Sequence, residues 1–349
     1  MLNSTSLCYS ILTIMSIGKK SFENMGRFLN KTGEIVARYL MPASDNFKLC
    51  GAVAQKLFAD NKELCLVIDQ TLIKKFFAKL IQGTGKFYDT KIGRKITAFN
   101  FAVASITDGK FKVPIGSSYF FDKESIEMMD DKPLSRDEVT KLFIKKAQDL
   151  FPKTILTILA DGAYSTIDFL KWCVANKIRA EMRMGKNRKV EINGKKMKLS
   201  ELLDSRKFRP RGRQMARKFS VKWHDLSLEL TIERRFDKNE NESFVFLVAT
   251  YKALPREHVA MYKKRWTIEK IFRTTKQHLG LQECFSKSFA IQDNHTSAVL
   301  LAYALTQLEM KTYRLKIPED AINQLKKKNA TSLQARFDSI LSPFYTAMA

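Results

Sequence analysis

The chain has 349 residues with 61 Lys or Arg against 36 Asp or Glu, so its formal net charge is +25 at pH 7. This balance predicts a polyanionic partner, with nucleic acid as the first candidate and an anionic membrane surface as the second, but no apolar run is long enough to span a bilayer. The scattered positions of the five cysteines and four histidines argue against a disulfide framework, a zinc finger and a histidine metal site, so a metal here is expected to have oxygen ligands.

Residues 1–60 predict a helical N-terminal segment. It is a candidate DNA-binding module, and simple packing against the rest of the protein is the alternative. The next stretch, Leu64–Ile68, is a continuous apolar run that predicts a buried central strand. This strand is expected to end at Asp69 and to present its carboxylate there. Turn formation alone would also explain an aspartate at a strand end.

Two further strands are predicted at Lys95–Ile106 and Phe111–Phe121. Asp108 and Gly109 between them form a strong hairpin signal, so these strands should be antiparallel neighbours. A capping box at Ser135 then predicts a helix to about residue 150.

A second buried strand is predicted at Thr154–Ala160, and it also ends in an aspartate, Asp161. A helix at 165–176 and a strand at 178–184 should follow. This alternation of helix and strand is typical of parallel pairing. Because parallel strands carry their carboxyl ends at the same edge, Asp69 and Asp161 are expected to lie together.

A β-rich basic insertion is predicted at residues 183–252. Its first part, residues 183–222, contains fifteen Lys or Arg, seven through Lys198 and eight from Arg206 on, against three acids. A solvated face would mix the two signs of charge, so this excess predicts a surface that follows a phosphate backbone. Trp223 in this insertion is a candidate for base stacking, and core packing is the alternative.

The stretch Met261–Leu279 predicts one amphipathic helix. Tyr262, Arg265, Glu269 and Lys276 would fall within an arc of about 60° on it. A carboxylate beside a hydroxyl, a guanidinium and an ammonium suits one metal ligand among donors that hold phosphate oxygens.

A solvated helix is the alternative for this stretch, with Glu269 paired to Arg265 and Arg273 at helical spacing. The tail, residues 311–349, is expected to be helical in pieces.

Asp69, Asp161 and Glu269 therefore come from three separate predicted elements. Carboxylate oxygens are the ligands that Mg²⁺ prefers. Two such ions can activate a water or a hydroxyl and stabilise the departing oxygen in phosphodiester cleavage.

The spacing of Tyr262, Arg265, Glu269 and Lys276 matches the YREK signature of the insertion-sequence-four family of bacterial DDE transposases. The surrounding string, YKKRWTIEKIFRTTKQHLGL, also resembles the terminal motif of that family.

Two further stretches, ADGAY at 160–164 and IDQT at 68–71, are similar to the second and first aspartate motifs of the family. The resemblance covers about residues 64–303. It departs from the family at Gln70, where many relatives have a second acid. The region before Asp69 is also short for a terminal-repeat-binding domain, which predicts a truncated or decayed copy as one alternative.

The resemblance implies an α/β fold with an RNase H-like mixed sheet flanked by helices. Its catalytic domain would comprise residues 61–182 and 253–310, interrupted by the insertion, with helical segments at both ends of the chain. Asp69, Asp161 and Glu269 would bind two Mg²⁺ ions, for which Mn²⁺ can substitute.

The resemblance also implies that Tyr262, Arg265 and Lys276 contact DNA phosphates, with Arg273 beside them on the same helix. Some relatives pass through a DNA hairpin in which a flipped base stacks on a Trp of the insertion, a role that would fall to Trp223 here.

The sequence thus predicts a bacterial, cytoplasmic DNA transposase that is nucleoid-associated when bound to DNA. It would act as a homodimer on terminal inverted repeats and target DNA by strand cleavage and strand transfer. Two alternatives are an RNase H-like nuclease without strand transfer and a decayed, non-catalytic DNA-binding relative. Only the transposase would yield joined DNA molecules.

Overall fold

The computed structural model describes residues 4–16, 18–42, 45–76, 81–127, 133–204, 208, 210 and 215–327. The chain forms two compact units, each assembled from separate stretches. Met1–Asn61, Gln70–Pro152 and Ile268–Ala349 make the first unit, and Lys62–Asp69 and Lys153–Thr267 make the second. Strand β1 (Glu63–Lys74) contributes its first half to the second unit and its second half to the first.

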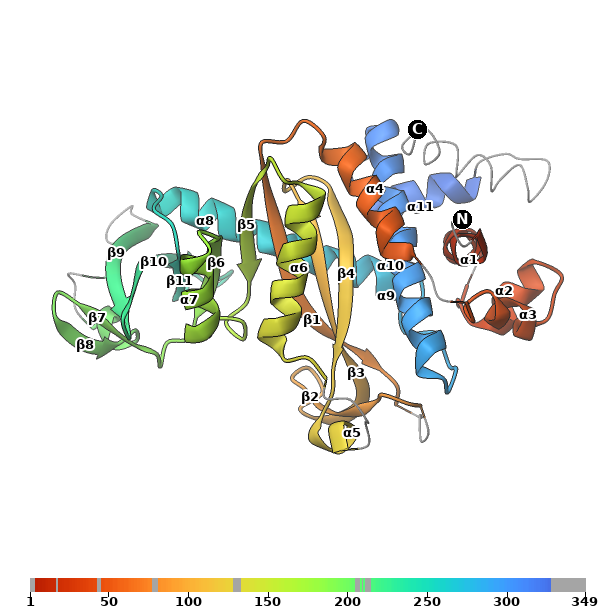
Figure 1. Cartoon of the computed structure of the whole chain (residues 1–349), viewed down its shortest axis with the longest axis horizontal. Helices are drawn as coiled ribbons and strands as arrows, with labels where there is room; N and C mark the ends of the chain where they lie inside the picture. The colour runs from red at the N-terminus through yellow and green to blue at the C-terminus, as the bar shows by residue number, and fades with distance from the viewer. Residues whose placement is uncertain are drawn as a thin grey trace. The chain divides into compact units, whose positions relative to one another are not determined.

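The first unit contains one long buried helix, α10, together with several shorter helices (Figure 1). In chain order they are α1 (Ser4–Met15), α2 (Phe22–Phe28), α3 (Gly33–Arg38), α4 (Asn46–Phe58), α5 (Lys123–Glu127), α6 (Arg136–Leu150), α9 (Thr267–His278), α10 (Phe289–Thr312) and α11 (Pro318–Lys327). Helix α10 is buried on most sides because α1, α4, α11 and strand β4 all pack against it. A helix surrounded in this way needs apolar residues all round rather than on one stripe.

The sheet of the first unit contains the second half of β1 together with β2 (Gly85–Asp89), β3 (Arg94–Thr107) and β4 (Lys112–Phe120). The predicted hairpin is confirmed, since β3 and β4 pair antiparallel around a turn in which Gly109 has a φ of 103°. The predicted helix start is also confirmed, because Ser135 caps α6 in a capping box with Glu138. Helices α4, α6 and α10 all pack on β4.

The second unit contains the first half of β1 and seven further strands. They are β5 (Ile155–Ala160), β6 (Arg179–Met184), β7 (Lys189–Ile192), β8 (Lys195–Lys198), β9 (Ala216–Trp223), β10 (Leu226–Phe236) and β11 (Glu242–Ala249), with α7 (Ile167–Ala175), α8 (Pro255–Lys263) and two short 3₁₀ helices, η1 (Glu201–Leu203) and η2 (Lys264–Trp266). Strand β1 pairs parallel with β5, and β5 pairs parallel with β6, as predicted. The order then continues β6-β11-β10-β9-β7-β8.

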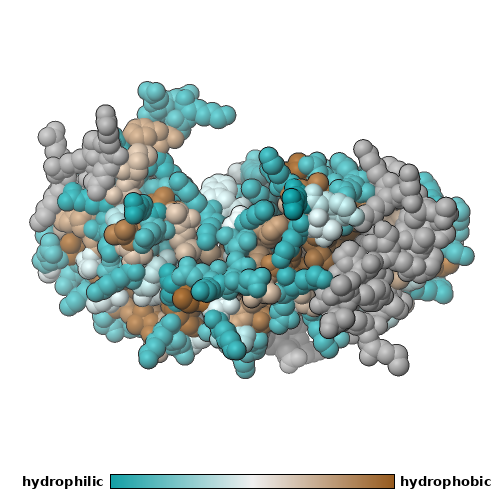
Figure 2. Space-filling view, turned by 90° about the horizontal axis from the view of Figure 1, so that it is seen from above, coloured by the Kyte–Doolittle hydropathy of each residue, from teal (hydrophilic) through white to brown (hydrophobic). Residues whose placement is uncertain are grey.

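This arrangement confirms the predicted mixed α/β fold of RNase H-like type, with helices flanking the sheet. Among the described residues, no helix is both long enough and apolar enough to cross a membrane. On the face shown in Figure 2, hydrophilic side chains cover much of the described surface.

Two predicted boundaries are wrong. Strand β1 does not end at Asp69 but continues to Lys74, because hydrogen bonding to β3 supports the polar residues that follow. The helix predicted over residues 261–279 is interrupted, since the 3₁₀ turn η2 separates α8 from α9. Residues 328–349 of the predicted helical tail lie outside the described residues.

Candidate active site

Asp69 and Asp161 directly follow a matched pair of residues on two parallel strands of the second unit. The register of β1 and β5 pairs Ile68 with Ala160. Asp69 is the next residue of β1, and Asp161 is the first residue after the end of β5. Adjacent strands lie about 4.8 Å apart, and residues in matching register point to the same face of the sheet. The backbones of the two aspartates therefore lie next to each other at the point where β5 ends.

Arg265 binds the first of these acids. It lies in η2, and its Nη1 donates to Oδ2 of Asp69 at 2.7 Å. The two side chains are only 12% and 13% exposed, so solvent screens this charge-assisted hydrogen bond less than it would at the surface. The guanidinium also lies 5.4 Å from the ring centroid of Trp266, which limits its orientation.

Tyr262 lies against the second strand of the pair. Its ring is buried among Val245, Leu247 and Val259, and its hydroxyl donates to the carbonyl of Ala160 at 3.3 Å. Burial raises the pKa of this hydroxyl to about 12, with the positive charge of Arg265 opposing that shift and the carboxylate of Asp161 adding to it. The hydroxyl is therefore protonated at neutral pH and can donate a hydrogen bond.

The turn after β5 orients Asp161. The Ala163 backbone N–H donates to Oδ1 of Asp161 at 2.8 Å. Gly162 between them packs closely, since a Cβ at this position would lie 3.2 Å from the Arg183 carbonyl oxygen. The predicted ADGAY motif thus forms a tight turn that fixes one carboxylate oxygen.

Glu269 and Lys276, the other two residues of the predicted arc, lie on α9 in the first unit, as does Arg273. Glu269 is half-buried in the first turn of this helix, and Arg273 is exposed one turn later. The ammonium of Lys276 donates to Thr71 Oγ1 at 2.6 Å and to the Leu72 carbonyl at 2.9 Å.

The pKa of Lys276 is lowered to about 8, mainly by burial and in addition by the neighbouring positive charges of Lys74 and Lys91.

The basic insertion is described only in part. Arg206, Lys207, Arg209, Arg211 and Arg213 lie outside the described residues. Trp223 is 4% exposed, and the guanidinium of Arg188 lies 5.5 Å from its ring centroid. A stacking role for Trp223 stays a prediction, and it would require the ring to become accessible.

The two aspartates have the donor chemistry of a divalent-metal site, because hard cations prefer carboxylate oxygens. Across the part of the chain that the structure describes, no three Asp, Glu, His or Cys side chains lie close enough to hold a metal ion. Asp69 is also bound to Arg265. A cation at Oδ2 of Asp69 therefore requires the guanidinium to move away from that oxygen.

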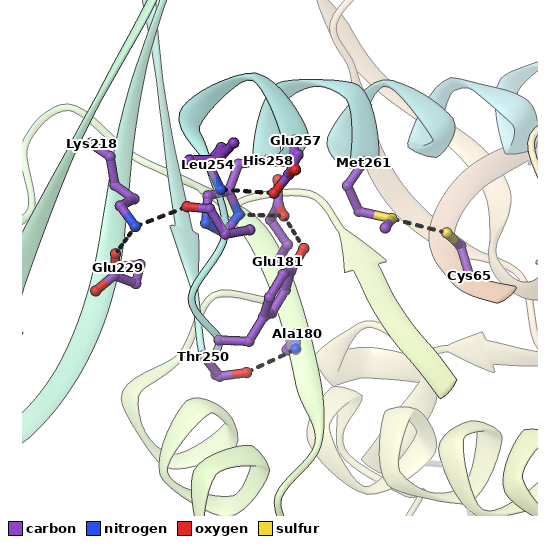
Figure 3. Close-up of polar contacts among 12 residues, drawn as sticks. Cys65, Ala180, Glu181, Lys218, Glu229, Thr250, Leu254, Glu257, His258 and Met261 are labelled. Carbon is purple, nitrogen blue, oxygen red and sulfur yellow. Dashed lines mark hydrogen bonds and ion pairs between the residues drawn. The ribbon is translucent and has the colours of Figure 1, made fainter. Parts of the chain in front are cut away.

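The structure also reveals a buried polar cluster that sequence reasoning missed. Glu181 on β6 accepts hydrogen bonds from Tyr251 at 2.5 Å and from Nδ1 of His258 at 2.9 Å (Figure 3). Two signals could have found it. Glu181 is an acid inside the strand predicted at residues 178–184, and His258 lies four residues before Tyr262 on the same helix face.

The whole of this framework lies within a recognised family domain. The family model described as the transposase DDE domain matches residues 60–305, which is more than half of the chain. The matched stretch contains Asp69, Asp161 and Glu269, and it begins after helix α4. No curated protein matches the chain.

Proposed function

Because the chain belongs to the transposase DDE domain family, we propose that it is a DNA transposase of the insertion-sequence-four group. It binds the terminal inverted repeats of its element, cleaves the DNA strands there and joins the freed ends to target DNA. The observation that carries this proposal is the parallel register that pairs Ile68 with Ala160, the residues just before Asp69 and Asp161.

The proposed ligands of two divalent cations are Asp69, Asp161 and Glu269, with Mg²⁺ as the natural ion and Mn²⁺ as a substitute. Bound there, the cations would activate the attacking oxygen and stabilise the departing one. The Ala163 N–H holds one oxygen of Asp161, which lowers the cost of orienting this carboxylate when the cation and DNA bind.

Arg265, Tyr262 and Lys276 are the proposed phosphate contacts, with Arg273 exposed on α9 as a fourth. Arg265 supports this role because its guanidinium has the geometry for bidentate binding of a phosphate. On DNA binding it would exchange Asp69 for a phosphate oxygen. That exchange would release the Asp69 oxygen for a cation at the moment when substrate arrives.

The net charge of the chain supports DNA as its partner. A net charge of +25 supports DNA binding that is driven by release of counterions. We further propose a homodimer in the synaptic complex, since two element ends must be held together, and a bacterial, nucleoid-associated location.

The test is a product analysis with purified protein. A labelled DNA carrying the ends that flank the reading frame is incubated with a target plasmid and Mg²⁺, and products are separated on native and denaturing gels. The proposal predicts strand breaks at the ends and labelled ends joined to the plasmid. Breaks without joined molecules would identify a nuclease, and binding without breaks in Mg²⁺ or Mn²⁺ would identify a decayed DNA-binding relative.

The matched control is Asp168→Asn, which removes an exposed carboxylate from α7, near Asp161 in sequence. This variant should give both products at the wild-type level.

A further inference from the structure

A fully buried carboxylate joins strand β6 to helix α8. Glu181 and His258 have side chains that are 0% and 1% exposed, and the Tyr251 hydroxyl shares Oε2 of Glu181 with the histidine. Figure 3 shows Glu181 and His258 meeting between the strand and the helix.

Burial raises the pKa of Glu181, against the hydrogen bonds from His258 and Tyr251. An apolar set of the same volume would often stabilise a fold as well as a buried polar cluster does, without the desolvation cost. In this cluster Oε1 of Glu181 and Nε2 of His258 have no hydrogen-bond partner among the described residues. Compared with apolar packing, the cluster also fixes how its side chains are oriented, because hydrogen bonds are directional.

The helical stretch from His258 in α8 to Arg265 in η2 crosses three neighbouring strands in order. His258 contacts Glu181 on β6, Tyr262 contacts Ala160 on β5, and Arg265 contacts Asp69 on β1. Seven helical residues rise about 10 Å, and two strand spacings also amount to about 10 Å. The match means that fixing the helix at β6 sets where Tyr262 and Arg265 reach the other two strands.

The segment that leads into this helix is fixed to the same strand. The Thr250 hydroxyl accepts from the Ala180 N–H at 2.9 Å and donates to the Ile178 carbonyl at 2.8 Å. The Arg179 guanidinium lies 4.3 Å from the ring centroid of Tyr251. Helix α8 is therefore tied to β6 both through its own His258 and through the residues that precede it.

We propose that Glu181, Tyr251 and His258 form a positioning clamp for the active site. The clamp holds α8 on the sheet so that Tyr262 and Arg265 meet the strands that carry the two aspartates. These three are positioning residues that act through Tyr262 and Arg265. The inference rests on the proposed function for its catalytic consequence.

The experiment compares three substitutions in the full chain. His258→Phe keeps a ring but removes the Nδ1–H donor, His258→Asn restores a donor near the Nδ1 position, and Tyr251→Phe removes only the hydroxyl. Val190→Ala is the control, since it truncates a buried side chain on β7 without touching α8.

Each protein is measured for thermal unfolding, for affinity to end DNA and for the single-turnover rate of strand cleavage with all DNA bound. A small displacement of a catalytic group is expected to slow the bound complex by about 10- to 100-fold. When it is measured well below its unfolding temperature, His258→Phe should show this loss of rate while its affinity for end DNA stays unchanged. Tyr251→Phe should show a smaller loss, and His258→Asn should recover most of the rate.

The control separates positioning from stability, because Val190→Ala should lower the unfolding temperature and leave the bound-complex rate unchanged. Wild-type rates in folded His258→Phe and Tyr251→Phe would overturn the clamp, as would a His258→Asn variant as slow as His258→Phe. If His258→Phe does not fold, Tyr251→Phe alone decides. Absence of cleavage by the wild-type protein would instead overturn the proposed function, and the clamp's catalytic role with it.

Discussion

Asp69 and Arg265 form a largely buried ion pair in the candidate site, with Oδ2 and Nη1 at 2.7 Å. A pair of this kind contributes little to stability by itself, because its attraction is offset by the loss of hydration. Its value in the proposed mechanism lies in exchange, since the same guanidinium can bind either the carboxylate or a DNA phosphate. In the proposed mechanism, DNA binding therefore frees the Asp69 oxygen for a cation.

Replacement of Arg265 by Ala should reduce the single-turnover rate of strand cleavage by about 100-fold or more, because an electrostatic contact to the reacting phosphate is lost. Arg256→Ala is the matched control, since it removes an exposed guanidinium from α8. Labelled end DNA resolved on a denaturing gel gives both rates. Equal rates for the two variants would contradict the role of Arg265.

Lys276 gives the site a dependence on pH. Its pKa is lowered to about 8, with burial as the main cause. The ammonium is charged below this value and neutral above it, so a contact from Lys276 to a phosphate is lost as pH rises through about 8.

Affinity for end DNA should therefore fall between pH 7 and pH 9 in the wild-type protein. In Lys276→Arg the fall should be smaller, because arginine keeps its charge across this range. Fluorescence anisotropy at constant ionic strength measures both profiles. Identical pH profiles for the two proteins would show that Lys276 does not contact the DNA.

Among the elements, those with local signals could be predicted from the sequence. The hairpin between β3 and β4 and the capped start of α6 follow from a few neighbouring residues. The break at η2 could not be predicted, because the apolar spacing of residues 261–279 continues unchanged across it. The 3₁₀ turn carries Arg265, whose bond to Asp69 depends on a tertiary contact.

The candidate site was predictable to a similar extent. The parallel pairing of the two strands followed from the sequence, and the register matches Ile68 with Ala160, the residues just before Asp69 and Asp161. The continuation of β1 beyond Asp69 was missed because pairing with β3 supports a polar stretch that has no apolar signal of its own. Glu181 was missed because its partners lie about seventy residues further along the chain.

The capping box of α6 offers an element-scale test of stability that leaves the site intact. Ser135→Ala should lower the free energy of unfolding by about 1 kcal/mol, because the N-cap hydroxyl no longer accepts from the Glu138 N–H. Denaturant titration measures this change, and the strand-cleavage assay should show wild-type rates below the transition. A cleavage defect in the folded variant would mean that α6 influences the site.

At the scale of the whole molecule, the three proposed catalytic acids come from different parts of the chain. Asp69 and Asp161 belong to the second compact unit and Glu269 to the first, and all three lie within the matched transposase DDE domain. The proposed chemistry needs every one of them. Binding of DNA, by contrast, depends mainly on the basic charge of the chain.

The central claim is tested most directly by strand cleavage of end DNA with and without Mg²⁺ in the wild-type protein and in Asp69→Asn, Asp161→Asn and Glu269→Gln. The account predicts metal-dependent breaks at the element ends in the wild-type protein. Each variant should bind the same DNA and leave it uncut. Metal-dependent cleavage at the wild-type rate by any one variant would remove that residue from the proposed catalytic set, and cleavage by all three would contradict the account.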